Sequence, residues 1–216
     1  MDHPLRGDNY KELRKRVVSL LENGFSIQRQ SNIVFVCGGN DANHMRKRFQ
    51  SAFPALLPDY EYFEPEFAMT NYLSFDDPTP FDIAEFEELI GALSHSIVLF
   101  PEGAGSCAEL GYFSAKNELA EKIALVLDAP RQKTGSFISL GPAKRIASVS
   151  RFQQSIQIDY ENPDFSIISE RIKEMAPLSK NRRNFSVAVF SKTTPFELFT
   201  LFTKLFRCWE SRLWKT

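Results

Sequence analysis

The stretch of residues 96–111 constrains the fold of this 216-residue chain more than any other. It begins with a continuous apolar run, residues 96–100, which is typical of a buried strand. The run stops at the small-residue segment 101–106, and a helical pattern that carries one carboxylate, Glu109, follows. Small residues let a ligand approach the backbone, and the N–H groups at a helix start attract anions such as phosphate. This order predicts a nucleotide or sugar-phosphate site with an acid beside it.

Strand and helix patterns alternate through about residue 128. The expected order is helix 9–24, strand 32–37, helix 41–52, strand 60–63, helix 81–94, strand 96–100, helix 106–119 and strand 122–127. Strands that are separated by helices pair in parallel, with helices on both faces of the sheet. The sequence therefore predicts an α/β fold with a parallel, Rossmann-like sheet.

The pattern weakens beyond residue 130. We expect a structured loop at residues 136–142, a helix at 165–175, a strand at 185–190 and an aromatic-rich helix from Pro195. Two regions result: an α/β domain over residues 1–150, and a short, basic and aromatic C-terminal extension over residues 151–216 that serves for docking.

Charge is distributed unevenly along the chain. Residues 171–216 contain ten Lys or Arg against three Glu, whereas the other residues contain sixteen against twenty-four acids. Such asymmetry favours contact with a polyanion or an acidic protein near the C-terminus, and a solvated basic face is the alternative. No apolar stretch is long enough to cross a membrane, and three cysteines are too few for a disulfide framework or a zinc site. We expect a cytoplasmic protein without a metal.

Acidic side chains are the candidates for catalysis. Cleavage of an N-glycosidic bond passes through a cationic sugar, which a carboxylate such as Glu109 can stabilise or attack. The alternative for Glu109 is an acid that the helix dipole favours near an N-terminus. Glu87 and Asp82 lie on the preceding helix. There Asp82 is alternatively the helix cap, and Glu87 alternatively belongs to a solvated acidic face.

Candidates for substrate binding follow the ends of the predicted strands, where ligands of parallel sheets bind. A paired-glycine loop follows the first strand, an acid that can hold ribose hydroxyls follows the second, and the small-residue turn follows the third. They are Cys37, Gly38, Gly39, Asn40, Asn43, Glu66, Pro101, Glu102, Gly105 and Ser106.

Several segments in order along the chain carry a resemblance to a known family. They are residues 35–44, 64–66, Glu87, 100–113, 136–138 and 141–142. The chain resembles the retron-associated effector proteins with a nucleoside 2-deoxyribosyltransferase-like domain, over roughly residues 10–150. The resemblance implies that Glu109 is the catalytic glutamate and that residues 37–40, Asn43, Glu66, Glu87 and Ser106 line the pocket. Asn40 departs from the Asp that the family often has after the glycine pair.

The resemblance also implies a role and partners. Such a protein is the effector, or toxin, of a bacterial anti-phage system, and a reverse transcriptase and multicopy single-stranded DNA joined to RNA (msDNA) hold it inactive. It cleaves an N-glycosidic bond of a nucleotide, with NAD or another nucleotide as substrate and no further cofactor. Contact with msDNA through the basic C-terminal segment and homo-oligomers that complete each other's pockets are expected by the same analogy.

Other functions fit parts of the pattern. The same strand, loop and helix suit a nucleotide-sensing module without chemistry, and the aromatic tail suits a plain interaction subunit. Phosphoribohydrolases of the lysine-decarboxylase-like group also have a glycine-rich turn before a glutamate. They favour Pro-Gly-Gly-x-Gly-Thr, which residues 101–106 match less well.

Overall fold

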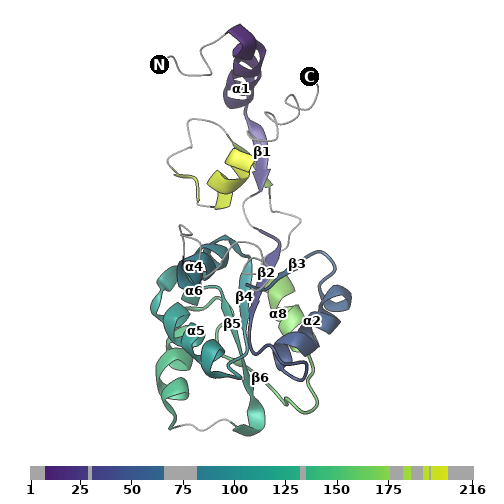
Figure 1. Ribbon diagram of the computed structural model, residues 1–216, viewed down its shortest axis with the longest axis vertical. Helices are drawn as coiled ribbons and strands as arrows, with labels where there is room; N and C mark the ends of the chain where they lie inside the picture. Colours follow the sequence, from purple (N-terminus) through teal and green to yellow (C-terminus); the bar gives the residue numbers. More distant parts are fainter. Residues whose placement is uncertain are drawn as a thin grey trace. The chain divides into compact units, whose positions relative to one another are not determined.

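Figure 1 shows the computed structural model of the chain, which describes residues 8–28, 31–65, 82–131, 135–175, 182–185, 192–194 and 196–203. The chain divides into two units, and each is described by itself. Residues 32–177 form the larger one, called the α/β unit below. Residues 1–31 and 178–216 form the other, called the terminal unit.

The α/β unit is built on a five-stranded parallel sheet with the order β3-β2-β4-β5-β6. The strands are β2 (Ile33–Cys37), β3 (Glu61–Phe63), β4 (Ser96–Leu99), β5 (Ile123–Asp128) and β6 (Ile156–Ile158). In the central pair, Val34 lies opposite Ser96 and Cys37 opposite Leu99. The parallel sheet is as predicted. The sequence did not reveal β6, in which an exposed Gln157 separates the two buried residues Ile156 and Ile158.

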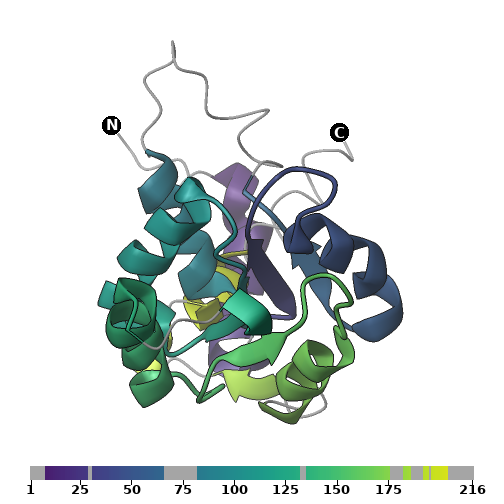
Figure 2. The same cartoon turned by 90° about the horizontal axis from the view of Figure 1, so that it is seen from below.

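Helices cover both faces of this sheet (Figures 1 and 2). One face packs against α2 (Met45–Leu56) and α8 (Ser166–Met175), and the other against α4 (Ile83–Leu93), α5 (Ala104–Ala115), α6 (Asn117–Ala120) and α7 (Lys144–Val149). Successive strand residues alternate between the two cores, as the pleat requires: Val36 packs with the α2 side and Cys37 with the α5 side. Because both faces are buried, the inner strands β2, β4 and β5 read as nearly continuous apolar runs.

Three predicted elements differ from the structure. Helix α2 begins at Met45 because residues 41–44 form a turn, in which His44 N donates to Asp41 O at 2.9 Å. The predicted helix 106–119 is split into α5 and α6. The predicted loop 136–142 is wrong: it contains a wide helical turn, η4 (Ser139–Ala143), that runs directly into α7. Pro142 lacks an N–H to donate, which the irregular turn tolerates.

The terminal unit joins segments from far apart in the sequence. It contains a short helical turn η2 (Asp8–Tyr10), helix α1 (Lys11–Asn23), strand β1 (Phe25–Gln28) and strand β7 (Arg182–Phe185), and residues 196–203 are helical. Gly24, predicted to stop α1, has φ 72°, a conformation that favours glycine. Strands β1 and β7 pair antiparallel. Phe185 of the predicted strand 185–190 is the last residue of β7, and residues 186–190 lie outside the described residues.

The division at residues 31 and 177 differs from the predicted boundary at residue 150. Strand β6 and helix α8 complete the α/β sheet and its core, so residues 151–177 belong with it. Residues 1–31 belong to the terminal unit through the pairing of β1 with β7.

Within the described part of the chain, none of the helices is both long and apolar enough to traverse a bilayer.

Glu102 fastens the loop after β4 to the loop after β2. Its Oε2 accepts a hydrogen bond from Met45 N at 2.6 Å, and its Oε1 accepts from Gly39 N and Arg46 N, both at 3.4 Å. The carboxylate thus caps the N-terminus of α2, where the helix dipole favours negative charge. His44, at the N-cap position itself, makes no side-chain bond of this kind.

Removing this carboxylate is expected to destabilise the α/β unit. We predict that Glu102→Ala lowers the free energy of unfolding by about 2–3 kcal/mol, because hydrogen bonds to a charged acceptor and a helix cap are lost together. Glu102→Gln, which keeps one acceptor oxygen, should lose about half as much. Urea denaturation followed by circular dichroism measures both. Glu170→Ala, at an exposed position on α8, is the control, and an equal midpoint for Glu102→Ala and this control would refute the role.

Candidate active site

The order in which strands are added to the sheet reverses between β2 and β4. After β2 the chain crosses one face of the sheet through α2 to reach β3, and after β4 it crosses the other face through α5 to reach β5. The loops 38–44 and 100–103 therefore diverge from adjacent strand ends. This switch point is where ligands of such sheets bind. Both loops predicted from the sequence meet there.

Three of the predicted residues come together at this point. Cys37 ends β2, is fully buried, and points to the face covered by α5. Its thiol is within hydrogen-bonding reach of Glu109 from α5, and the charges of Glu109 and Glu87 from α4 both act on it. The site thus places two carboxyl groups around one strand end.

The Cys37 thiol stays protonated in this setting. Burial raises its pKa well above the usual value, and the charges of Glu109 and then Glu87 raise it further, although the Arg46 guanidinium opposes them. A neutral thiol donates a hydrogen bond to Glu109 and is a poor nucleophile. Cys37 therefore orients the carboxyl group of Glu109.

The two acids are aimed by the packing of their helices. On α5, the residues Leu110 and Phe113 are fully buried against the sheet, which sets the rotation of the helix around Glu109. On α4, Glu87 is buried at 7% exposure, and Gly91 one turn later lets the helix pack closely: a Cβ there would lie 2.9 Å from Leu119 Cδ2. The sequence could not separate Glu87 from its acidic neighbours on α4.

Asp82 has the capping role that the sequence left open. It precedes α4, is exposed, and its Oδ1 accepts a hydrogen bond from Glu85 N at 2.8 Å. This is the usual N-cap arrangement. The structure thus gives Asp82 a task in holding α4, on which Glu87 lies.

The glycines of the two loops have different surroundings. A Cβ on Gly38 would lie 2.8 Å from Arg46 Cβ, and one on Gly39 would lie 2.0 Å from His44 Nδ1. The glycine pair is therefore required by the protein's own packing. By contrast, a Cβ on Gly103 or Gly105 would meet no described atom within 4 Å. Open space borders the start of α5, which permits close approach by a ligand.

The turn into α5 is braced from inside by Ser106. Its buried Oγ accepts hydrogen bonds from Glu102 N at 3.0 Å and Gly103 N at 3.1 Å. The sequence analysis expected the N–H groups at this helix start to bind an anion. Two of them instead donate to Ser106 within the protein. Pro101 and Glu102 precede this turn and line a neighbouring cavity.

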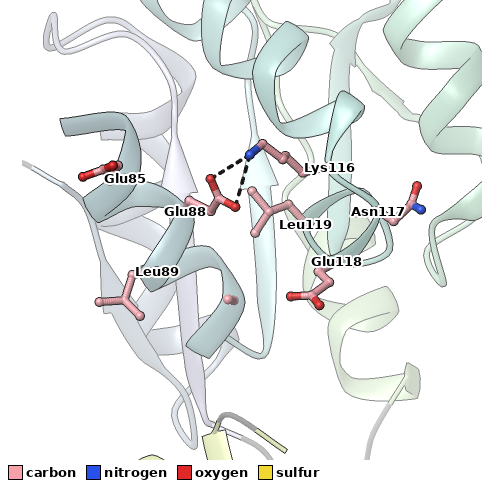
Figure 3. Close-up of a pocket in the computed structure, with 8 residues that line it drawn as sticks. Glu85, Glu88, Leu89, Lys116, Asn117, Glu118 and Leu119 are labelled. Carbon is pink, nitrogen blue, oxygen red and sulfur yellow. Dashed lines mark hydrogen bonds and ion pairs between the residues drawn. The ribbon is translucent and has the colours of Figure 1, made fainter. Parts of the chain in front are cut away.

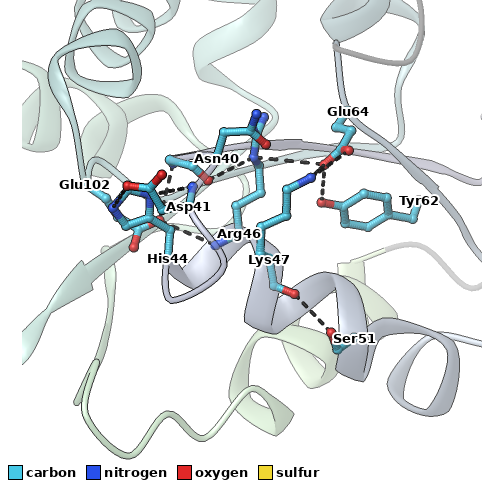
Figure 4. A network of polar contacts seen from close by, with 10 residues as sticks. Asn40, Asp41, His44, Arg46, Lys47, Ser51, Tyr62, Glu64 and Glu102 are labelled. Carbon is cyan, nitrogen blue, oxygen red and sulfur yellow. Dashed lines mark hydrogen bonds and ion pairs between the residues drawn. The ribbon is translucent and has the colours of Figure 1, made fainter.

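Arg46 is a buried cation that sequence reasoning missed (Figure 4). Its side chain is 2% exposed, and it donates from Nε to Gly39 O at 3.2 Å and from Nη2 to Asn40 Oδ1 at 3.1 Å. Its Nε also lies 4.0 Å from Glu64 Oε2. Arg46 thereby holds the paired-glycine loop in place. As one of three consecutive basic residues, it showed no sign of burial in the sequence.

Glu64 anchors the far side of the same network (Figure 4). It is 3% exposed, accepts from Lys47 Nζ at 2.9 Å and Tyr62 OH at 3.1 Å, and follows β3 directly. Glu66 lies outside the described residues. Asn43 is exposed in the loop before α2, and Asn40 is exposed but bound to Arg46.

A cavity of about 350 Å³ lies at the carboxyl ends of β4 and β5, next to the loop 38–44. Its volume falls in the range of small-molecule sites. Arg131 and Asp128 form an ion pair at 3.0 Å on its wall. It is lined by His44, Pro101, Glu102, Leu127, Asp128, Arg131, Ser136, Ile138 and Tyr160.

A groove of about 500 Å³ lies between α4 and α6 (Figure 3). Glu88 crosses it to pair with Lys116 at 3.1 Å and accepts from Tyr112 OH at 2.7 Å. The groove is lined by Glu85, Glu88, Leu89, Ala92, Lys116, Asn117, Glu118 and Leu119. These are not the predicted site residues, so the candidate active site stays at the strand ends.

Comparison with known proteins shows which family the chain belongs to. The model of the STM3845 retron effector protein family matches residues 42–211. An Escherichia coli protein named "Retron Ec86 putative ribosyltransferase/DNA-binding protein" is 35% identical over 129 residues, which are 58% of this chain and 41% of that relative. The chain thus covers about two fifths of the length of this relative. Because the family model spans most of the sequence, the chain belongs to the STM3845 retron effector family.

Proposed function

We propose that this retron effector cleaves the N-glycosidic bond of a nucleotide, with NAD as the preferred substrate and Glu109 as the acting carboxylate. The observation that carries the proposal is the meeting of Glu109, Glu87 and Cys37 at the switch point of the sheet. The open space beside Gly103 and Gly105 gives a sugar room next to this group.

The chemistry needs a negative charge close to the anomeric carbon. As the C1′–N bond breaks, its electron pair goes to the base and the sugar becomes cationic, which a carboxylate stabilises. Water then supplies oxygen to C1′ and releases a proton. In NAD the nicotinamide nitrogen carries a positive charge, so this base leaves without being protonated. A neutral purine needs an acid, for which Glu87 is the candidate.

The name of the Escherichia coli relative supports this assignment, since it includes ribosyltransferase. Transfer and hydrolysis share the cationic sugar and differ in whether a second acceptor or water attacks it. By the sequence resemblance, we further propose that a reverse transcriptase and msDNA hold the effector inactive. A second copy of the chain completing the pocket belongs to the same proposal.

Glu109→Gln tests the central claim. Purified chain is incubated with NAD and a panel of nucleotides, and released base is detected by chromatography. We expect the variant to lose about 10²- to 10³-fold in rate, as for loss of an electrostatic stabiliser of a transition state. Glu88→Gln, which changes an acid held by Lys116 in the neighbouring groove, should keep the wild-type rate.

Equal base release by wild type and Glu109→Gln would refute the role of Glu109. If neither protein releases base while Glu109→Gln keeps nucleotide binding and its effect on cells, the chain is a sensing module.

Arg46→Lys tests whether the buried guanidinium positions the loop beside the site. Lysine keeps the charge but cannot reach Gly39 O and Asn40 Oδ1 together. We expect kcat to fall about tenfold because small displacements in an active site are costly. Asn40→Ala removes one of the two bonds and should give an intermediate kcat. A kcat that is the same in all three proteins would contradict the positioning role.

A further inference from the structure

The cavity at the carboxyl ends of β4 and β5 has no part in the reaction proposed above. It adjoins the candidate active site through one loop: Pro101 and Glu102 line the cavity, and Gly103, with open space beside it, follows them directly. A molecule bound next to Gly103 can therefore extend over the strand ends into this cavity. The volume of about 350 Å³ is in the range of small-molecule sites.

Much of the cavity wall is apolar. Leu127, the penultimate residue of β5, is 5% exposed, and Ile138 packs against the same core. Tyr160 has all its polar groups bound within the protein: its N donates to Asp128 Oδ1, its O accepts from Arg48 Nη1, and its OH donates to Val126 O at 2.9 Å. Tyr160 thus offers a ligand mainly apolar surface. A flat base packs well on such a wall.

The polar part of the wall includes an acid at a strand end. Asp128 is the last residue of β5, and its side chain is 11% exposed. Its Oδ1 accepts from Tyr160 N at 3.2 Å, and its Oδ2 pairs with Arg131 Nε at 3.0 Å. The Arg131 side chain is 79% exposed, so this pair contributes little and a ligand can replace it. An acid after a parallel strand is well placed to accept from ribose hydroxyls.

The charge of the wall disfavours a lone phosphate as the ligand. Two acids, Glu102 and Asp128, stand against one arginine, Arg131, which gives a formal charge of −1. The His44 ring adds no charge, because its Nδ1 accepts a hydrogen bond from Asp41 N at 3.1 Å. A neutral nucleoside, with hydroxyls and a flat base, suits this wall better than an anion. Arg131 is the group that can contact a phosphate attached to that nucleoside.

We propose that this cavity binds the second nucleoside of a dinucleotide substrate, with Asp128 as the acceptor for its ribose hydroxyls and Arg131 beside the diphosphate. The inference rests on the proposed function, in which the first nucleoside is cleaved beside Glu109. It makes the chain selective for NAD over nicotinamide mononucleotide, which has the same scissile bond and lacks the second nucleoside. The cavity residues set specificity and take no part in bond cleavage.

The test measures binding to the full chain that carries Glu109→Gln, so that turnover does not interfere. Isothermal titration calorimetry gives the Kd of NAD and of nicotinamide mononucleotide, and their ratio reports on the second nucleoside. We expect NAD to bind about tenfold more tightly, because it adds hydrogen bonds to a charged acceptor. Asp128→Asn, which keeps an acceptor for Tyr160 N, should remove most of this difference.

Ile138→Trp gives a second test that leaves the charges unchanged. The larger ring fills the cavity, so NAD should lose its advantage over nicotinamide mononucleotide, and circular dichroism checks that the variant is folded. Asp59→Asn is the matched control. It removes the same charge at an exposed position before β3, at the opposite edge of the sheet, and should keep the wild-type ratio.

Competition identifies the part of the ligand that is bound. Adenosine should displace NAD, whereas inorganic phosphate at the same concentration should not, and the reverse result would overturn the proposal. Equal Kd values for NAD and nicotinamide mononucleotide, or equal effects of Asp128→Asn and Asp59→Asn on their ratio, would also overturn it.

The outcome is separable from that of the proposed reaction. If wild type releases no base while NAD keeps its Asp128-dependent advantage in binding, the reaction is refuted and the second nucleoside site is supported. Base release from both substrates with equal Kd values would support the reaction and refute the site.

Discussion

A single carboxylate controls the geometry of the switch point. Glu102 leaves the loop after β4, which leads to α5, and accepts three backbone hydrogen bonds around the start of α2 on the opposite face. These contacts fix the two loops relative to each other, although the chain takes them in different directions. The distance between these two loops determines the open space beside α5. The glycine pair and the Arg46 network depend on the same distance. Glu102, which the sequence suggested as a ligand contact, thus holds together the two loops that border the site.

The sequence predicted the sheet well because buried parallel strands are recorded locally as apolar runs. From the order of strand, turn and helix it predicted that Glu109 faces a bound ligand, and the structure brings Glu109 to Cys37 at the end of β2. Contacts between side chains that are far apart in the sequence do not show in any local sequence pattern. Arg46 looked like an ordinary basic residue, and Glu64 like an ordinary loop acid, until packing brought them within 4.0 Å. The glycine pair was predicted to border a substrate, and the sequence could not show that the side chains of Arg46 and His44 lie where a Cβ on Gly38 or Gly39 would be.

Charge and chemistry are separated in this protein. The candidate active site lies within the α/β unit, which is acidic, and uses acids for its proposed reaction. A nucleotide carries negative charge, so the proposed substrate would be held in this unit by local hydrogen-bond donors more than by a long-range field. The terminal unit has the reverse balance. The two units thus differ in the sign of their formal charge.

Strand pairing between β1 and β7 has a consequence for synthesis. In the register of the pair Phe25 lies opposite Phe185, so the pair forms only after residue 185 has left the ribosome. Residues 32–177 emerge before that and can fold first, since their strands are close in sequence. A newly made effector therefore acquires its α/β unit ahead of its completed terminal unit. Any restraint that acts through the terminal unit begins only after β7 has been synthesised.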